Sequence, residues 1–244
     1  MPQSIAAIRG NDTGYLAFHA PRYRFVLELV DRYLPRGGRV LDIGLSPLTR
    51  LLRDHVGAPI DTLGLETASN VADGIHHQFD LNRLGDPDAV APTLPAYDII
   101  VCAEVIEHLY TSPYTILRFL HRALAPNGIL IVQTPNAASL FKRVRLVLGV
   151  HPYEMLRETR STNPGHYREY TVSELQAIAR ATGFDVIDLE RRYYFDARFA
   201  DMDDAGRGRR PRPLIGAIKN VVYGALPPFL REGVTLVLRK SAAR

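Results

Sequence analysis

The residue types best suited to chemistry gather in one short stretch and one distant segment. Glu104, Glu107 and His108 lie within five residues of one another, and His166 stands in the later segment His166 to Thr171. Carboxylate oxygens and imidazole nitrogens together bind hard or borderline divalent cations such as magnesium. We therefore predict that these four side chains form a metal site.

Two other interpretations of the same residues need no metal ion. Histidine titrates close to working pH, so His108 or His166 would then act as the general base, with Glu107 as the third catalytic candidate. Alternatively, Glu107 and His108 only cap and brace the helix that follows them. The residue types alone are compatible with all three interpretations.

A glycine turn and a distant acid form a second group. A short apolar run ends at Gly44, which lacks a Cβ atom and so lets a ligand approach the backbone. Glu66 follows about 20 positions later, at the end of the apolar run Ile60 to Leu65. A carboxylate at the tip of a second strand can accept hydrogen bonds from both ribose hydroxyls. The pattern predicts a nucleoside-binding unit, and an ordinary surface glutamate is the alternative.

Both groups need strands whose carboxyl ends lie side by side. Tyr97 to Cys102 is a continuous apolar run, typical of a strand buried on both faces of a parallel sheet, and it leads into Glu104. Ile129 to Gln133 is predicted as the next strand. Between them, a helix opens at Ser112 and buries four residues, Ile116, Leu117, Leu120 and Leu124. Strand, helix and strand in this order predict a mostly parallel sheet with a ligand crevice at its carboxyl edge.

Further segments surround this core. Arg22 to Leu34 carries apolar residues at helical spacing and is expected to pack against the edge of the sheet. Thr171 and Glu174 form a capping box that opens another helix. Phe184 to Glu190 and Gly233 to Arg239 are predicted as two final strands.

Length and composition bound the class of protein. The 244 residues contain no polar linker between two self-sufficient halves, so one domain is expected. No apolar run approaches the roughly 18 to 20 residues that cross a bilayer, and the first residues do not resemble a secretory signal. The single cysteine, Cys102, excludes a disulfide framework and a cysteine-based zinc site. These features favour a cytoplasmic protein, and the net charge of +4 permits an anionic partner.

The ordered motifs resemble those of class I S-adenosylmethionine-dependent methyltransferases. They are VLDIG, Glu66, the Phe-Asp-Leu of positions 79 to 81, DIIVCAEVIEHL, LAPNGILIVQTPN and HYREYT. The most similar branch includes ubiquinone-pathway O-methyltransferases and small-RNA 2′-O-methyltransferases. The resemblance implies a Rossmann-like α/β fold, in which a doubly wound, seven-stranded, mostly parallel sheet ends in an antiparallel pair.

The resemblance also implies how one methyltransferase domain over residues 1–244 is organised. Residues 1–34 would form an N-terminal helical cap, 35–136 the cofactor-binding core, 137–170 an acceptor lid, and 171–244 the C-terminal helices and strands. A short amphipathic helix with solvated arginines is the alternative for the lid. Relatives close a mobile N-terminal segment over the cofactor, for which the candidates here are Tyr15, His19, Arg22 and Tyr23.

Cofactor contacts carry over from the resemblance by position. Asp42 and Gly44 would lie beside the methionine portion of S-adenosylmethionine, and Glu66 would hold the ribose. The adenine would lie between Asp80 and Leu81, and the methionine end would lie over Ala103 and Glu104. Where relatives have alternating glycines, this chain has Ser46 and Leu48, which puts a close approach of the cofactor at Ser46 in doubt.

In the similar branch, the residues that match Glu104, Glu107, His108 and His166 are metal ligands. A divalent metal ion such as magnesium would bind hydroxyls of the acceptor and lower their pKa. The acids and histidines near the expected methyl position favour oxygen as the acceptor atom. We therefore expect methyl transfer to a hydroxyl of a small-molecule or glycan acceptor, with release of S-adenosylhomocysteine.

Three rival functions stay open. RNA 3′-terminal 2′-O-methylation fits the metal residues, but the sequence has no recognisable RNA-binding module, so RNA is not the favoured partner. A nucleotide-binding oxidoreductase fits Gly44 and Glu66 but lacks the three-glycine turn. A noncatalytic methyltransferase-like subunit is compatible with Ser46 and Leu48.

The C-terminal third contains two segments with open roles. The arginine-rich stretch 207–212 could meet a phosphate, or it could be a solvated part of a mobile 196–213 loop. Leu214 to Leu230 includes an amphipathic helix that could pack on the core, form a dimer contact or touch a membrane surface as a peripheral protein. The sequence is accordingly compatible with a monomer or a homodimer.

Overall fold

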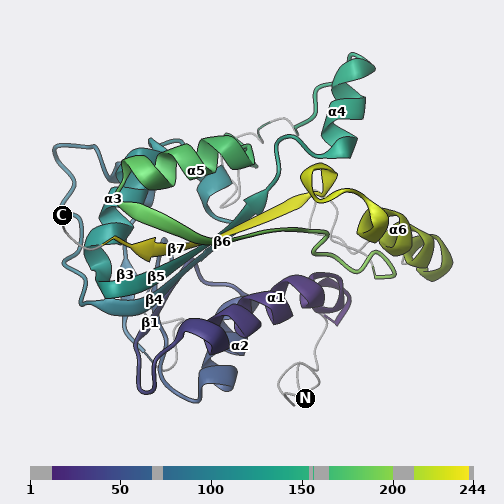
Figure 1. Ribbon diagram of the computed structural model, residues 1–244. Coiled ribbons are helices and arrows are strands. Elements are labelled where there is room, and N and C mark those ends of the chain that lie inside the picture. The colour runs from purple at the N-terminus through teal and green to yellow at the C-terminus, as the bar shows by residue number, and fades with distance from the viewer. Residues whose placement is uncertain (1–12, 68–73, 154–155, 157–164, 200–211, 242–244) are drawn as a thin grey trace.

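The computed structural model describes residues 13–67, 74–153, 156, 165–199 and 212–241. One seven-stranded sheet has the order β3-β2-β1-β4-β5-β7-β6 (Figure 1). Its strands are β1 (Val40–Ile43), β2 (Asp61–Gly64), β3 (His76–Gln78), β4 (Tyr97–Ala103), β5 (Leu124–Pro135), β6 (Phe184–Arg192) and β7 (Gly233–Lys240). The first five are parallel, and β7 runs antiparallel to both β5 and β6. The predicted fold class, including its antiparallel final pair, is confirmed.

Helices cover both faces of this sheet. In Figure 1, α1 (Thr13–Tyr33) and α2 (Pro47–Val56) lie below it, and α3 (Pro113–Ala123) and α5 (Val172–Ala181) lie above it. Two further helices, α4 (Leu140–Val147) and α6 (Pro213–Ala225), project away from the sheet at one end. Short 3-10 turns are η2 (Leu81–Arg83), η3 (Ile106–His108) and η4 (Pro228–Leu230). Among the described residues, no helix is both long and apolar enough to cross a membrane.

The central strand β4 shows why its sequence is continuously apolar. Ile99 and Val101 belong to the apolar cluster on the α1 and α2 face, whereas Ile100 and Cys102 belong to the cluster on the α3 and α5 face. Side chains alternate between the two faces of a strand, so a strand covered on both sides needs apolar residues at successive positions. The strand order reverses between β1 and β4, and ligands of doubly wound sheets bind at such a point.

Helix α1 differs from the expectation in two ways. It begins at Thr13 rather than Arg22, with Pro21 inside the helix. It also packs on the face of the sheet rather than its edge, because Val26 and Leu29 share a buried cluster with residues of the central strands. The helical spacing identified the buried stripe of α1 but could not say which part of the sheet it covers.

The other boundaries differ in smaller ways. Ser112 precedes α3, as expected, but its side chain makes no capping hydrogen bond. Leu124 was expected in that helix and is instead the first residue of β5, paired with Tyr97 across a register shift. The capping box of α5 is confirmed, because the Glu174 carboxylate accepts a hydrogen bond from the Thr171 amide at 2.8 Å and the Thr171 side chain accepts one from Glu174 N.

Candidate functional site

The tips of the parallel strands lie in one row at the carboxyl edge of the sheet. Gly44, which follows β1, donates its amide to the Leu63 carbonyl of β2 at 2.7 Å and has a φ of +84°. The Glu104 amide, beyond β4, donates to the Gln133 carbonyl of β5, also at 2.7 Å. These hydrogen bonds tie neighbouring strand ends together, so residues that are far apart in sequence border the same edge.

Glu66 folds back over the end of β2. Its Oε2 atom would lie 2.5 Å from a Cβ atom built on Gly64, so this glycine leaves the room that the carboxylate occupies. Oε2 is buried and has no hydrogen-bond partner among the described residues. A buried carboxylate oxygen without a donor costs free energy, which a ligand with hydroxyl donors would relieve. This buried oxygen fits the ribose role predicted for Glu66.

Asp42 and Ser46 hold the glycine turn and the start of α2. The buried Asp42 carboxylate accepts a hydrogen bond from Thr49 Oγ1 at 2.6 Å, and burial raises its pKa to about 7. Ser46 Oγ accepts from Leu48 N at 3.2 Å, and Ser46 N donates to Thr49 Oγ1 at 3.1 Å. The serine that departs from the glycine pattern is thus the N-cap of α2, a role in which serine is favoured.

Asp80 and Leu81 follow β3 at the same edge. Phe79 N donates to the Gly64 carbonyl at 2.8 Å, which joins the end of β3 to the end of β2. Asp80 Oδ1 accepts a hydrogen bond from Asn82 N at 2.9 Å, and Leu81 is buried. The structure therefore brings the predicted adenine residues to the edge that carries Gly44 and Glu66, and their contact with adenine stays a prediction.

Glu104 lies beyond Ala103, the last residue of β4, and faces helix α1. Its φ of +55° is uncommon for a residue with a side chain, and such backbone strain occurs preferentially at functional sites. Glu104 Oε2 lies 3.3 Å from Arg22 Nη1, and both side chains are largely buried. Arg22 Nη2 donates to the Tyr23 hydroxyl at 3.4 Å, whereas its buried Nε has no partner among the described residues.

Three of the four predicted metal ligands converge. Ligand atoms of Glu107, His108 and His166 all lie within 4.8 Å of one another, and Glu104 is not in this group. His108 Nδ1 is 2.8 Å from the Gly165 carbonyl. His166 Nδ1 is 2.9 Å from a carboxylate oxygen of Glu169. Metal-bound histidines usually use one ring nitrogen in this way and bind the ion through the other.

Glu107 is fully buried in this cluster. Its Oε2 accepts a hydrogen bond from Thr134 Oγ1 at 2.9 Å, and its Oε1 is buried with no hydrogen-bond partner among the described residues. Burial, and then the neighbouring Glu104 carboxylate, raise the pKa of Glu107. Glu107 and His108 both lie in η3. Glu107 accepts its hydrogen bond from β5, and His108 contacts the Gly165 carbonyl, so capping of α3 does not explain where these two side chains lie.

Sequence reasoning missed two residues that support this cluster. Lys142, at the start of α4, is buried against Glu169 in an ion pair and also donates to the Asn136 carbonyl at 3.2 Å. Burial opposes the charge of Glu169, but His166 and Lys142 outweigh it and lower its pKa. No local pattern of residues indicates that Lys142 has a partner 27 positions away.

Arg22 was only one of four candidates on the N-terminal helix, and no sequence signal distinguished it. The other three, Tyr15, His19 and Tyr23, lie on the same helix. The His19 ring lies 4.2 Å from the Tyr15 ring and 5.3 Å from the Phe195 ring, and Tyr23 is buried. Of the arginine-rich stretch, positions 207–211 lie outside the described residues, as do Asn163 and Pro164 before the HYREYT motif.

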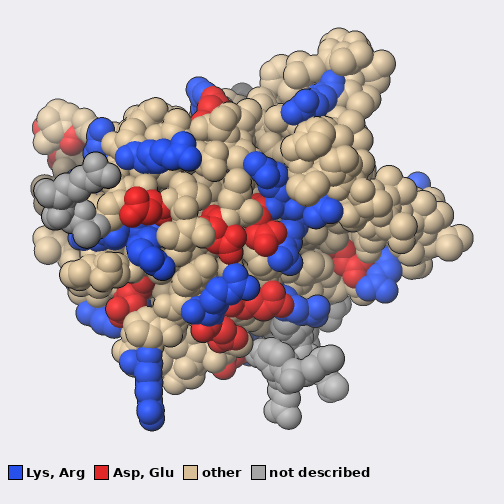
Figure 2. Space-filling model, in the orientation of Figure 1, with Lys and Arg blue, Asp and Glu red and all other residues tan. Residues whose placement is uncertain are grey.

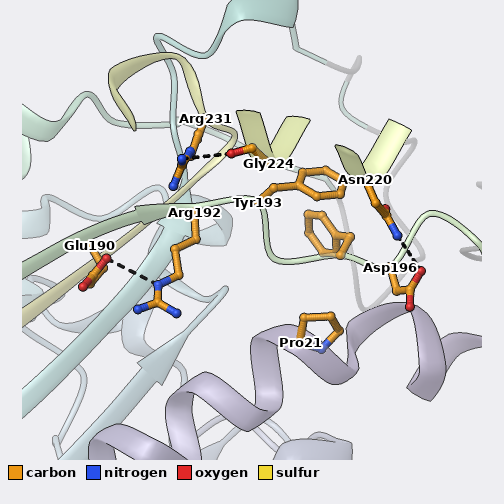
Figure 3. Close-up of a pocket in the computed structure, with 9 residues that line it drawn as sticks. Pro21, Glu190, Arg192, Tyr193, Asp196, Asn220, Gly224 and Arg231 are labelled. Carbon is orange, nitrogen blue, oxygen red and sulfur yellow. Dashed lines mark hydrogen bonds and ion pairs between the residues drawn. The ribbon is translucent and has the colours of Figure 1, made fainter. Parts of the chain in front are cut away.

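A separate open cavity of about 450 Å³ lies between α1, β6 and α6 (Figure 3). Its charged groups are bonded to one another or to backbone: Arg192 to Glu190, and Arg231 to the Gly224 carbonyl. Asp196 likewise accepts a hydrogen bond from Asn220 at 2.8 Å. The cavity therefore adds space beside α1, and the charged side chains that line it among the described residues are paired.

Comparison with known proteins agrees with this geometry. A family model of the methyltransferase domain matches residues 18–189. No curated protein matches the sequence. A methyltransferase from Haloferax volcanii, solved with the Trm112 methyltransferase activator, has a TM-score of 0.58 at 16% identity over 99% of both chains.

Two other solved structures are similar. A methyltransferase from Archaeoglobus fulgidus that depends on S-adenosylmethionine has a TM-score of 0.52 at 17% identity, covering 89% of this chain and 94% of its own. The [4+2]-cyclase SpnF has a TM-score of 0.54 at 19% identity, covering 92% of this chain and 82% of its own. These likenesses concern the fold, and the family match extends over most of the chain. The chain belongs to the methyltransferase-domain family, the class I S-adenosylmethionine-dependent methyltransferases.

Proposed function

We propose that this protein transfers the methyl group of S-adenosylmethionine to a hydroxyl of a small-molecule or glycan acceptor and releases S-adenosylhomocysteine. One observation carries the choice of oxygen: Glu107, His108 and His166 cluster beside Glu104, at the edge where the cofactor is expected. A hydroxyl must lose a proton when it is methylated, and this cluster contains groups that bind a metal ion or accept a proton.

The cofactor supplies a methyl group on a sulfonium that is already a good leaving group, so the protein mainly orients the reactants and excludes water. In the proposed arrangement, the buried Oε2 of Glu66 accepts hydrogen bonds from the ribose. Asp80 and Leu81 flank the adenine. The methionine portion lies along Asp42, Gly44, Ser46 and Ala103.

We add Arg22 to the proposed cofactor site. The amino-acid end of the cofactor carries one carboxylate and one ammonium group. Arg22 and Glu104 offer the two matching charges, and they pair with each other at 3.3 Å in this structure. Arg22 also keeps a buried Nε without an acceptor among the described residues. We propose that Arg22 holds the carboxylate of the cofactor and Glu104 its ammonium group.

A divalent metal ion fits the residues beside this end. Glu107 offers a buried oxygen without a hydrogen bond in the described part of the chain, and both histidines are oriented through Nδ1. When bound, such an ion would lower the pKa of the acceptor hydroxyl. Lys142 and Glu169 would fix His166, as carboxylates commonly do for metal-binding histidines. Without a metal ion, His166 or His108 would accept the proton.

The acceptor would enter beneath the proposed lid, residues 137–170. Its described part contains α4 and is joined to the site by Lys142 and Glu169. The helix that the alternative interpretation predicted for this segment is present, and a helix and a lid are compatible. We propose that the lid positions the acceptor over Glu104.

Two measurements test the proposal in sequence. Calorimetry with S-adenosylhomocysteine and with NAD identifies the cofactor. If only NAD bound, the proposed methyltransferase activity would be wrong and an oxidoreductase would take its place. Incubation with methyl-labelled S-adenosylmethionine and separate pools of phenols, sugars and RNA then locates the acceptor. We expect label in phenols or sugars, and label in RNA alone would contradict the proposed acceptor class. Cofactor binding without transfer to any pool would support a noncatalytic subunit.

A further inference from the structure

Two neighbouring segments expose an unusual number of large apolar side chains. We call them together the α4–α6 surface. In the segment of α4 the exposed residues are Phe141, Val144, Leu146, Val147, Leu148 and Val150. In the segment of α6 they are Leu214, Ile215, Ile218, Val221, Val222 and Phe229. Their exposed fractions reach 86% at Val147, 76% at Leu214 and 72% at Val221. Apolar patches of this kind mark sites that bind another surface.

The outward direction of these side chains follows from how α6 is attached. Its inner side is held by Gly216, where an added Cβ would lie 2.0 Å from the Ala197 carbonyl oxygen. It is also held by Asn220, which accepts a hydrogen bond from Ala197 N at 2.9 Å. Positions 216 and 220 lie on one side of a helix. Tyr223 lies on the same side and packs on Tyr193, with ring centroids 4.8 Å apart. The exposed apolar side chains of α6 lie on its remaining sides, so this helix packs only part of its apolar residues on the core.

The two segments form one continuous surface. Leu140 and Phe141 of α4 line a small hollow together with Tyr223 and Leu226 at the end of α6. Figure 1 shows both helices projecting from the same end of the sheet. The α4–α6 surface also adjoins the candidate active site, because Lys142 of α4 is paired with Glu169.

The charged residues of the two exposed segments are basic. Residues 139–153 contain Arg143 and Arg145, the buried and paired Lys142, and no acid. Residues 212–231 contain Arg212, Lys219 and Arg231 but no acid. Glu232, which follows, lines the hollow between the helices. In Figure 2 the α4 projection is largely tan, with basic side chains at its base and along one side. The α4–α6 surface therefore combines exposed aliphatic groups with positive charge.

We propose that the α4–α6 surface docks on an anionic lipid bilayer. Transfer of aliphatic side chains from water into the acyl region is favourable, and arginine and lysine are attracted to lipid phosphates. A second copy of the chain fits less well, because a twofold interface sets the same patch against itself and brings basic residues together. Docking in this way would place the entrance of the active site at the membrane surface. The inference does not depend on the proposed acceptor.

Flotation of the full chain with vesicles tests this inference. We expect binding to vesicles of equal parts phosphatidylglycerol and phosphatidylcholine, weaker binding in high salt, and little binding to pure phosphatidylcholine. The double variant Val147→Asp with Val221→Asp should reduce the bound fraction roughly tenfold, since it replaces two apolar contacts by charges that anionic lipid repels. Val90→Asp is the matched control, because Val90 is 91% exposed and lies outside the α4–α6 surface.

Other outcomes would overturn the inference. Wild-type protein that stays unbound with both vesicle types would remove the membrane as the occupant. Equal loss of binding in Val90→Asp would show that the α4–α6 surface has no special role. Sedimentation that reveals a dimer, dissociated by the double variant, would assign the surface to a second copy. Circular dichroism and affinity for S-adenosylhomocysteine, each unchanged in the double variant, would confirm that it is folded.

Discussion

The two parts of the candidate site are built in different ways. At the ends of β1, β2 and β3, backbone hydrogen bonds bring Gly44 and Glu66 together through the register of adjacent parallel strands. Beside β4, side chains from η3, α4 and the segment 165–169 converge through ion pairs and imidazole contacts. The first part therefore depends on the fold as a whole, whereas the second depends on individual side chains. Single substitutions should separate them.

The largest expected effect is on the nucleoside side. Glu66→Ala should weaken the binding of both S-adenosylhomocysteine and methylthioadenosine by roughly 10- to 100-fold, because hydrogen bonds to a charged group are worth about 1.5–3 kcal/mol. Calorimetry measures both affinities, and Glu28→Ala on the exposed side of α1 is the control. Unchanged affinities would remove Glu66 from the ribose role.

Metal binding should depend on the side-chain cluster. His166→Ala should weaken manganese binding by roughly 10- to 100-fold, because it removes one of three converging ligands. Glu104→Gln sharpens the comparison, because a three-ligand site would leave its manganese affinity near that of wild type. An equal loss in both variants would place Glu104 in the site and oppose its pairing with Arg22. Calorimetry that detects no ion in the wild-type protein would exclude the metal and favour a histidine base.

Arg22 lies between the nucleoside side and the side-chain cluster, and its substitution should change the affinity for only one of two ligands. Arg22→Met should weaken the binding of S-adenosylhomocysteine by roughly tenfold, because the carboxylate of this ligand loses one charged hydrogen-bonding partner. Methylthioadenosine lacks the amino-acid end, so its affinity should be unchanged. Arg32→Met, on the exposed part of the same helix, is the control. If the affinities for both ligands fell equally, Arg22 would only support the fold. If neither affinity changed, Arg22 would not belong to the cofactor site.

The smallest effect concerns pH. Burial raises the pKa of Asp42 to about 7, whereas an unfolded aspartate titrates near 3.9. Between these values the folded protein binds a proton that the unfolded chain does not, so this contribution to stability is full below about pH 4 and is lost as pH rises through 7. Asp42→Asn should therefore reduce the fall in Tm between pH 5 and pH 8 by a few degrees.

Thermal unfolding at several pH values measures this slope. Asp54→Asn, at an exposed position of α2, is the matched control and should leave the slope as in wild type. A slope that stays the same in Asp42→Asn would show that Asp42 is ionised in the folded protein across this range.

Periodicity and turn residues were sufficient for most of the fold. The central strands and the α5 capping box could be predicted because alternation, helical spacing and capping are local properties of the chain. Leu124 was misplaced because its apolar side chain suits both the end of a helix and the start of a strand. Arg22 to Leu34 was correctly predicted as helix, but its position on the sheet depends on which strands become central.

By itself, the sequence determined the order of strands and helices and the residue types at the strand ends, because the constraints on them act over a few neighbouring positions. Only the tertiary structure decided that Arg22 meets Glu104, that Lys142 meets Glu169, and that three rather than four candidate ligands converge. It likewise decided that α4 and α6 expose their apolar residues. Such contacts depend on how segments far apart in the chain pack against one another, and a local pattern of residues does not determine that packing.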